Sequence, residues 1–245
     1  MNMAILRGFC MRFRFLFLLV ATSGLYAQVL PDWYLPLRNS VYEQNLKADE
    51  IVPIYNTAKE QANVSLSGAE LYEMLSRCEY MIARAYQFEG RKDPAAEHYA
   101  QGIEWAEKAL EIRESSVAWQ MLAENVSQSC AVRSTAYAIT NGPKVEKYAK
   151  NALAINKRNA AAQCILAARW VYAPAPFHNH RRGIEMMEAI ITEGDMEKDD
   201  MFNVYSGIGY AYVQQKKYAE ARPWLLKSLE VYPSNKYVQS LLAKS

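Results

Sequence analysis

The chain has 245 residues, of which 51% are apolar and 22% are charged, so it can bury one sizeable core and has no composition typical of disorder. Removal of the predicted leader takes away three arginines and no acidic residue, which lowers the formal net charge from +2 to −1 and leaves no basic surplus for nucleic acid. The chain without the leader keeps three cysteines, Cys78, Cys130 and Cys164. This odd number, the wide spacing and the lack of a CxxC pair indicate neither a disulfide framework nor a zinc motif.

Residues 1–27 have the pattern of a signal peptide. Three arginines within the first 14 residues precede an apolar stretch from Phe15, and small, neutral residues follow up to Ala27. The uncharged run from Phe15 to Ala27 is shorter than the roughly 20 residues that a membrane-spanning helix needs, although a permanent anchor stays the alternative. We therefore expect cleavage that leaves Gln28 first, and an exported protein, periplasmic or secreted, that is soluble and has no membrane span of its own.

Residues 28–44 contain prolines and no helical period in "QVLPDWYLPLRNS", so we expect an extended N-terminal arm. Residues 45–245 form the predicted domain. It opens with an additional helix over residues 46–62, kinked at Pro53.

Three pairs of helical segments follow along the chain. Apolar residues at helical spacing mark a first helix in each pair, and a similar second helix comes after it. The "NGP" at 141–143 predicts a turn that opens a helix. The paired segments are 78–90 with 105–112, 116–128 with 148–155, and 160–172 with 187–194.

The clearest unit is the last one, over "NVYSGIGYAYVQQKKYAEARPWLLKSLEVYPSN". Gly209 and Ala221 remove side-chain bulk where two antiparallel helices would touch. The spacing resembles the tetratricopeptide repeat, a helix-turn-helix unit of 34 residues. After it, "KYVQSLLAKS" predicts a capping helix that covers the apolar end of a solenoid. The positions with repeat-packing roles are Gly209, Tyr212, Ala221, Leu225 and Pro233.

The sequence therefore predicts an all-α fold, a right-handed tetratricopeptide-like solenoid with about four units and a C-terminal capping helix. Through "GIEWAEKALEI", "APAPF" and "GYAYVQQKKYAEARPWLLKSLEVYP" the chain also resembles exported repeat proteins associated with TRAP transporters, and more distantly the regulator-of-microtubule-dynamics family. The first resemblance implies a partner in the cell envelope, with a solute-binding protein as candidate, and an apolar ligand. The chain departs from that family in lacking a lipoprotein cysteine.

First helices line the concave face of such solenoids. The register of the last unit predicts a lining that mixes apolar and amide groups with almost no positive charge. We expect this face to bind a partner protein or peptide; the alternative is a carrier of a small hydrophobic ligand. The predicted binding positions are Met81, Phe88, Gln120, Glu124, Val171, Tyr172, Asn203, Ser206, Tyr210, Val213 and Gln214.

No enzymatic motif or cofactor-binding motif occurs, so we predict neither catalysis nor a cofactor. His178 and His180 in "APAPFHNHRR" are two possible metal ligands at most, where a site needs three or four, so they are predicted to be loop residues rather than a metal site. The sequence leaves the oligomeric state open.

Overall fold

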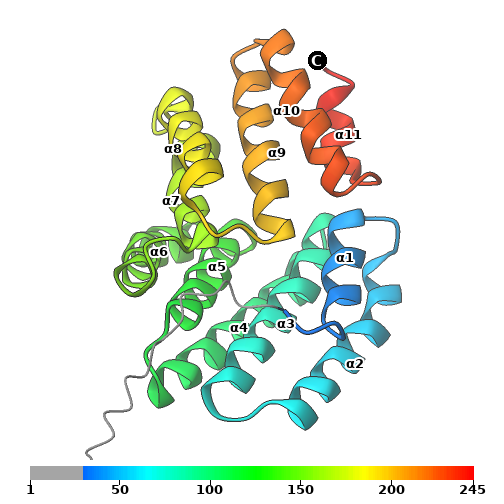
Figure 1. The fold of residues 1–245 in the computed structure, drawn as a ribbon, viewed down its shortest axis with the longest axis vertical. Coiled ribbons are helices and arrows are strands. Elements are labelled where there is room, and N and C mark those ends of the chain that lie inside the picture. The colour runs from blue at the N-terminus through cyan, green and yellow to red at the C-terminus, as the bar shows by residue number, and fades with distance from the viewer. Residues whose placement is uncertain (1–29) are drawn as a thin grey trace, which may run out of the picture.

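The computed structural model describes residues 30–245. In this part of the chain all the regular secondary structure is α-helix, and there is no β-strand (Figure 1). The predicted signal peptide lies outside the described residues. The helices are α1 (Leu35–Glu43), α2 (Ala48–Ser65), α3 (Gly68–Phe88), α4 (Lys92–Ile112), α5 (Ser116–Val132), α6 (Thr135–Ile155), α7 (Ala160–Tyr172), α8 (His180–Glu193), α9 (Lys198–Gln214), α10 (Tyr218–Val231) and α11 (Lys236–Leu242).

Short polar side chains cap the N-termini of several of these helices. The Ser115 hydroxyl accepts a hydrogen bond from the Ala118 backbone N–H at 3.0 Å, and so caps α5. The Asn159 and Asn235 side chains cap α7 and α11 in the same way. Each cap satisfies a backbone donor that the first turn of a helix leaves without a partner. The short connections between helices are therefore set by local sequence.

Four helix pairs make up the repeats: α3 with α4, α5 with α6, α7 with α8, and α9 with α10. Within the last pair, a Cβ placed on Gly209 would lie 2.5 Å from Leu225 Cδ2, and Ala221 and Leu225 are fully buried. Gly183 of α8 approaches Val171 of α7 as closely. Missing side chains thus let paired helices come together. The fold is an all-α helical-repeat solenoid of four units, with α11 packed on the last one.

Two local expectations were wrong. The predicted extended arm over residues 28–44 contains α1, because Pro36 suits the first turn of a helix and α1 buries one apolar face that includes Leu37 and Val41. The predicted turn at 141–143 lies inside α6, which continues through Pro143. The Asn141 side chain donates to the Tyr137 carbonyl at 3.1 Å within that helix.

The two ends of the solenoid meet. Tyr42 of α1 is buried, stacks on Tyr232 with ring centroids 4.9 Å apart, and meets Phe202 edge-on at 5.4 Å. The Asn235 side chain donates to the Tyr42 carbonyl at 2.6 Å, and Arg38 lies 3.9 Å from Asp199 of α9. Figure 1 shows α1 beside α3 and close to the C-terminal helices. The N-terminal helix therefore closes the solenoid against its last unit.

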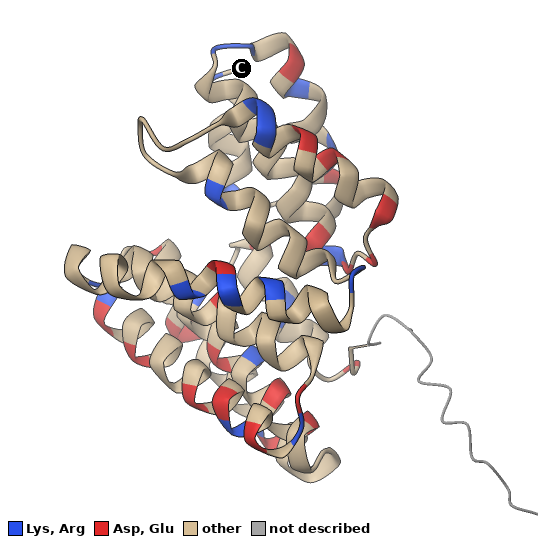
Figure 2. Ribbon diagram, turned by 90° about the vertical axis from the view of Figure 1, so that its left-hand side faces the viewer, with Lys and Arg blue, Asp and Glu red and all other residues tan. Residues whose placement is uncertain are grey.

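No helix in residues 30–245 combines the length and the hydropathy that crossing a bilayer requires. Positively and negatively charged positions are interspersed along the helices in Figure 2, so this view shows no face of a single sign.

Candidate functional site

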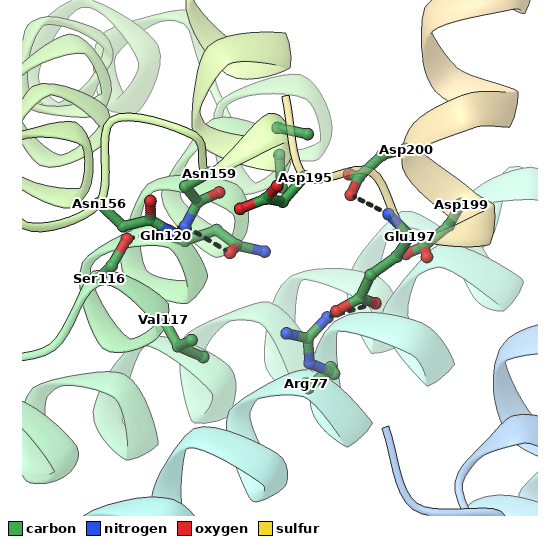
Figure 3. A pocket seen from close by; sticks show the side chains of 12 residues that line it. Arg77, Ser116, Val117, Gln120, Asn156, Asn159, Asp195, Glu197, Asp199 and Asp200 are labelled. Carbon is green, nitrogen blue, oxygen red and sulfur yellow. Dashed lines mark hydrogen bonds and ion pairs between the residues drawn. The ribbon is translucent and has the colours of Figure 1, made fainter. Parts of the chain in front are cut away.

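The inner helices α3, α5, α7 and α9 carry two adjacent groups of side chains. A cavity of about 100 Å³ lies near the N-terminal ends of α5, α7 and α9, and we name it the acidic cavity (Figure 3). An aromatic cluster, Arg84, Phe88, Tyr172, Tyr210 and Tyr237, lies toward the C-terminal ends of α3 and α7. The residues that line the acidic cavity are Arg77, Ser116, Val117, Gln120, Asn156, Asn159, Ala160, Ala161, Asp195, Glu197, Asp199 and Asp200.

One wall of the cavity is a hydrogen-bonded amide network. The Asn159 side-chain amide donates to the Ser116 hydroxyl at 2.9 Å and to Gln120 Oε1 at 3.0 Å, while its oxygen caps α7. Arg158 next to it pairs with Asp195 at 2.7 Å, and the Asp195 N–H donates to the Arg158 carbonyl at 2.8 Å. These contacts fix the connection after α8 beside the start of α7.

The opposite wall carries the start of α9. Glu197 and Asp200 form a capping box in which Asp200 Oδ2 accepts from the Glu197 N–H at 3.0 Å. Arg77 of α3 lies 3.7 Å from Glu197 Oε2, which is longer than a hydrogen bond. Glu197 Oε2 and Asp199 Oδ1 are buried and accept no hydrogen bond from the described residues.

Burial and mutual repulsion disfavour the ionised form of three carboxyl groups in this region. Burial raises the pKa of Glu124 to about 7, with the nearby Asp199 adding to the rise and Arg77 opposing it. Burial, and next the charge of Asp199, raises the pKa of Asp200 well above its usual range. Burial also raises the pKa of Glu197 against the opposing charge of Arg77. The start of α9 and the facing part of α5 therefore hold carboxyl groups that bind protons more tightly than exposed ones do.

Replacing Glu124 by glutamine should raise the free energy of unfolding at pH 8 by about 1 to 3 kcal/mol. The folded pKa of about 7 exceeds the ordinary value of 4.5, so ionised Glu124 destabilises the fold above pH 7. That cost disappears as the pH falls below 4.5, because both states then bind the proton. Urea unfolding at pH 8 and pH 4 measures the difference. Glu111→Gln, on the exposed face of α4, is the control, and an equal gain at both pH values would contradict the assignment.

The aromatic cluster presents large rings to solvent. Phe88, Tyr172 and Tyr237 are 42%, 45% and 39% exposed, and Tyr172 lies against Tyr210 with ring centroids 4.9 Å apart. Burial of the hydroxyl, then the proximity of Tyr237 and Tyr210, raises the pKa of Tyr172. Its hydroxyl lies over Gly207 of α9, 3.4 Å from where a Cβ would stand. Tyr172 thus has an exposed ring and a hydroxyl turned toward the inner helices.

Arg84 brings a positive charge into this cluster. Its guanidinium lies 4.7 Å above the Phe88 ring and donates to the Tyr80 hydroxyl at 3.3 Å. Within residues 30–245 no carboxylate comes within ion-pair distance of Arg84, and its Nε has no hydrogen-bond partner. A guanidinium that lies over aromatic rings and forms no ion pair can still donate hydrogen bonds to an anionic group or a carbonyl of a partner.

The structure does not bring the predicted binding positions together in one site. Phe88, Tyr172 and Tyr210 belong to the aromatic cluster, Gln120 lines the acidic cavity, and Glu124 lies one turn further along α5. Asn203 donates to the Tyr42 hydroxyl at 3.2 Å and so already has a partner in α1. Gln214 is exposed as the last residue of α9, away from that cluster and that cavity.

Four predicted binding positions are core residues instead. Met81, Val171 and Val213 are buried, and Val171 packs against Gly183 between α7 and α8. Ser206 is 4% exposed and bonds to the Asn203 carbonyl. Each of these residues belongs to a helix that packs against neighbours on more than one side. The periodicity of one helix does not show how many of its sides are covered.

The expectation of almost no positive charge on this face was also wrong. Arg77 and Arg84 are seven residues apart, which places them on one face of α3; Arg77 faces Glu197 at the start of α9, and Arg84 lies over the rings of Tyr42 and Phe88. That spacing, together with Asp199 and Asp200 at the start of α9, was the signal that could have indicated a charged interior.

His178 lies in the connection between α7 and α8, as predicted, whereas His180 is the first residue of α8. Their rings stack with centroids 4.3 Å apart, and His178 is exposed. In the described range no group of three His, Cys, Asp or Glu side chains is placed to hold a metal ion. Cys164 near the cavity is buried, and burial followed by the charge of Asp200 raises the pKa of its thiol. A protonated thiol is a poor nucleophile.

Comparison with known proteins agrees with this architecture. A scan against protein families matches the tetratricopeptide repeat at residues 80–109 and at residues 202–235. The chain is similar to a thermophilic repeat protein, TTC0263 of Thermus thermophilus, with 15% identity over 86% of this chain and 97% of that one and a TM-score of 0.52. A second structure, YrrB, described as a repeat protein with an unusual peptide-binding site, gives 14% identity over 85% and 89% of the two chains and a TM-score of 0.38. A search of curated proteins finds no match.

Proposed function

We propose that this chain, which carries tetratricopeptide repeats in an all-α helical-repeat solenoid, is an interaction scaffold that binds a segment of a partner protein. The observation that carries the proposal is the aromatic cluster. Exposed rings from α3, α7 and α11 lie near Arg84, whose guanidinium lies 4.7 Å above the Phe88 ring and forms no ion pair within residues 30–245.

Tryptophan, tyrosine and arginine are enriched among the few residues that dominate binding energy at protein interfaces, because aromatic rings bury much area and the arginine guanidinium donates several hydrogen bonds. Three rings of the cluster expose a large part of their surface to solvent, those of Phe88, Tyr172 and Tyr237. The hydroxyl groups of the two tyrosines lie in buried surroundings, which raise their pKa. An apolar side chain of a partner would cover these rings, and its backbone carbonyls or an acidic side chain would meet Arg84.

The alternative function, a carrier of a small hydrophobic ligand, has less support. The acidic cavity is lined by carboxylates, amides and Arg77, so an apolar molecule there would leave those polar groups without partners. The exposed aromatic cluster is better suited to a partner that arrives from outside.

Export and the identity of the partner belong to the same proposal. The arginine-rich start and the short apolar run before Ala27 support secretion. The resemblance to exported repeat proteins associated with TRAP transporters supports a partner in the cell envelope, with a solute-binding protein as the candidate.

Replacing Tyr210 by alanine should weaken capture of the partner by about 1 to 2 kcal/mol without unfolding the chain, as loss of a partly buried aromatic anchor does. A photo-crosslinking residue in place of Tyr172 should give covalent adducts with the same partner in an envelope extract. Affinity of the purified pair, measured with and without the Tyr210 ring, gives the magnitude.

Tyr218→Ala is the matched control, because Tyr218 is 42% exposed on α10 and lies outside the aromatic cluster. Circular dichroism shows whether each variant keeps its helices. Full affinity in Tyr210→Ala, or equal crosslinking from positions 172 and 218, would place the interface elsewhere.

The exported protein should begin at Gln28 and be found in the soluble envelope fraction. The reason is the short apolar run, which ends in small residues at Ala27. N-terminal sequencing of the exported material identifies the first residue. Retention of Met1 in a membrane fraction would contradict cleavage and favour the anchor.

A further inference from the structure

The connection between α7 and α8 presents five consecutive apolar residues to solvent. These are residues 173–177, "APAPF", and we name them the apolar tip. All but the first are exposed, and Phe177 is 72% exposed. The Phe177 N–H donates to the Pro174 carbonyl at 2.8 Å, and the Asn179 N–H donates to the Trp170 carbonyl at 2.9 Å. Hydrogen bonds within the connection therefore fix a turn that holds an aromatic ring in water.

The backbone of the apolar tip has few free donors. Pro174 and Pro176 have no N–H, and the Ala173 N–H donates to the Arg169 carbonyl at 3.3 Å. Only the Ala175 N–H finds no partner among the described residues. Backbone N–H groups without partners are a main cost of moving a loop out of water. The tip can therefore enter an apolar layer with the loss of one backbone donor.

Cations outnumber carboxylates at the base of the apolar tip. The ion pairs at the end of α7, the start of α8 and the facing part of α6 join three cations to two carboxylates. Arg182 adds a fourth cation, which forms no ion pair within residues 30–245 and lies 4.2 Å above the Trp170 ring. Figure 2 shows the connection as an uncharged loop that projects from the helices. The cations are Arg169, Arg181, Arg182 and Lys150, and the carboxylates are Glu146 and Glu185.

This order of groups, from the tip inwards, restricts the partner. The outermost layer is apolar, and the next layer has the Trp170 ring with exposed guanidinium groups beside it. An acidic polar partner would match the arginines but would leave the apolar tip uncovered. An anionic membrane has the same order in reverse, because phosphate groups lie outside and acyl chains lie beneath them. Both layers of the protein surface therefore meet a complementary layer of the membrane.

We propose that the apolar tip and the arginines at its base dock the protein reversibly on the surface of an anionic membrane. The Phe177 ring enters the boundary between headgroups and acyl chains, and Arg181 and Arg182 contact lipid phosphates. One ring and a small excess of positive charge provide weak attachment that salt reverses, so the protein is still recovered in a soluble fraction. This surface is separate from the aromatic cluster and takes a different partner.

Cosedimentation with sucrose-loaded vesicles tests the proposal. One set of vesicles contains phosphatidylglycerol and phosphatidylcholine in equal amounts, and the other contains phosphatidylcholine alone. The protein is purified in its exported form, and every variant has the same N-terminus, so any leader that remains contributes equally. We expect the partition coefficient on anionic vesicles to be about tenfold higher than on neutral ones. Raising the salt concentration to about 0.5 M should release the protein.

Two variants separate the apolar and the charged contributions. Phe177→Ala should lower the partition coefficient on anionic vesicles about fivefold, because it removes the ring that leaves water. Arg182→Gln should lower it about fivefold as well, through the loss of one charge near the lipid surface. Both side chains are exposed, so circular dichroism should show an unchanged helix content.

Val64→Ala is the matched control. Val64 is 83% exposed near the end of α2, which adjoins the start of α3, whereas the apolar tip follows the end of α7. This variant should bind vesicles as the wild type does, and so should Tyr210→Ala, which tests the partner protein alone. Absence of binding to anionic vesicles, equal binding to neutral ones, or unchanged binding of Phe177→Ala would each overturn the proposal. Loss of a captured protein in Phe177→Ala, without vesicle binding by the wild type, would assign the tip to a protein partner instead.

Discussion

Replacing Tyr42 by alanine should lower the free energy of unfolding by about 3 to 5 kcal/mol, the cost of removing a fully buried aromatic ring. Tyr42 of α1 is 1% exposed, and its ring packs against Tyr232 and Phe202 of the last unit. The loss should also release α1 from the C-terminal helices, because these rings join the two ends of the solenoid. Chemical denaturation measures the stability, and small-angle X-ray scattering measures the radius of gyration.

Tyr42→Phe is the matched control. It keeps the ring contacts and removes only the hydroxyl that accepts from Asn203 at 3.2 Å, so it should cost about 1 kcal/mol and leave the radius unchanged. Alanine and phenylalanine variants of equal stability would show that the ring contacts do not close the solenoid.

Replacing Gly209 by leucine should destabilise the last unit by about 1 to 3 kcal/mol or more, because α9 and α10 have no space for the side chain. A Cβ at this position would already lie 2.5 Å from Leu225 Cδ2 and 3.4 Å from the Leu225 backbone nitrogen. For a chain of this length, each kcal/mol lost lowers the melting temperature by roughly 2 to 4 °C. Thermal melting followed by circular dichroism gives the shift.

Gly142→Leu separates overpacking from any general effect of leucine in a helix. Gly142 lies within α6 and has nothing within 4 Å of its Cβ direction, so leucine there should be neutral or slightly stabilising. An unchanged melting temperature in Gly209→Leu would mean that α9 and α10 do not pack in the described register.

The acidic cavity and the aromatic cluster both depend on how the closure arranges the inner helices. Arg38 and Tyr42 of α1 reach α9, and α9 carries Asp199 at the acidic cavity and Tyr210 in the aromatic cluster. Release of α1 would therefore move one wall of each site. The Tyr42→Ala variant should accordingly lose both stability and binding of the partner protein, whereas Tyr210→Ala should weaken binding alone.

The sequence by itself determined the parts that depend on local pattern. Gly209, Ala221 and Leu225 predict a tight helix pair because their spacing and size act within one repeat unit, and the structure has α9 and α10 there. The helical fold class and the cap at the C-terminus follow from the same periodicity, which is visible within about 15 consecutive residues.

Only the tertiary structure decided which residues face one another across the solenoid. Residues 35–43 have a weak helical pattern of their own, and they form α1 because Leu37, Val41 and Tyr42 are buried against residues that lie up to 193 positions away. The pairing of Arg77 with Glu197 joins α3 to the start of α9, so no local period indicates it. Burial and electrostatic surroundings are sums over such distant neighbours, and for that reason the acidic cavity, the unpaired Arg84 and the buried state of Met81 could be found only in the folded chain.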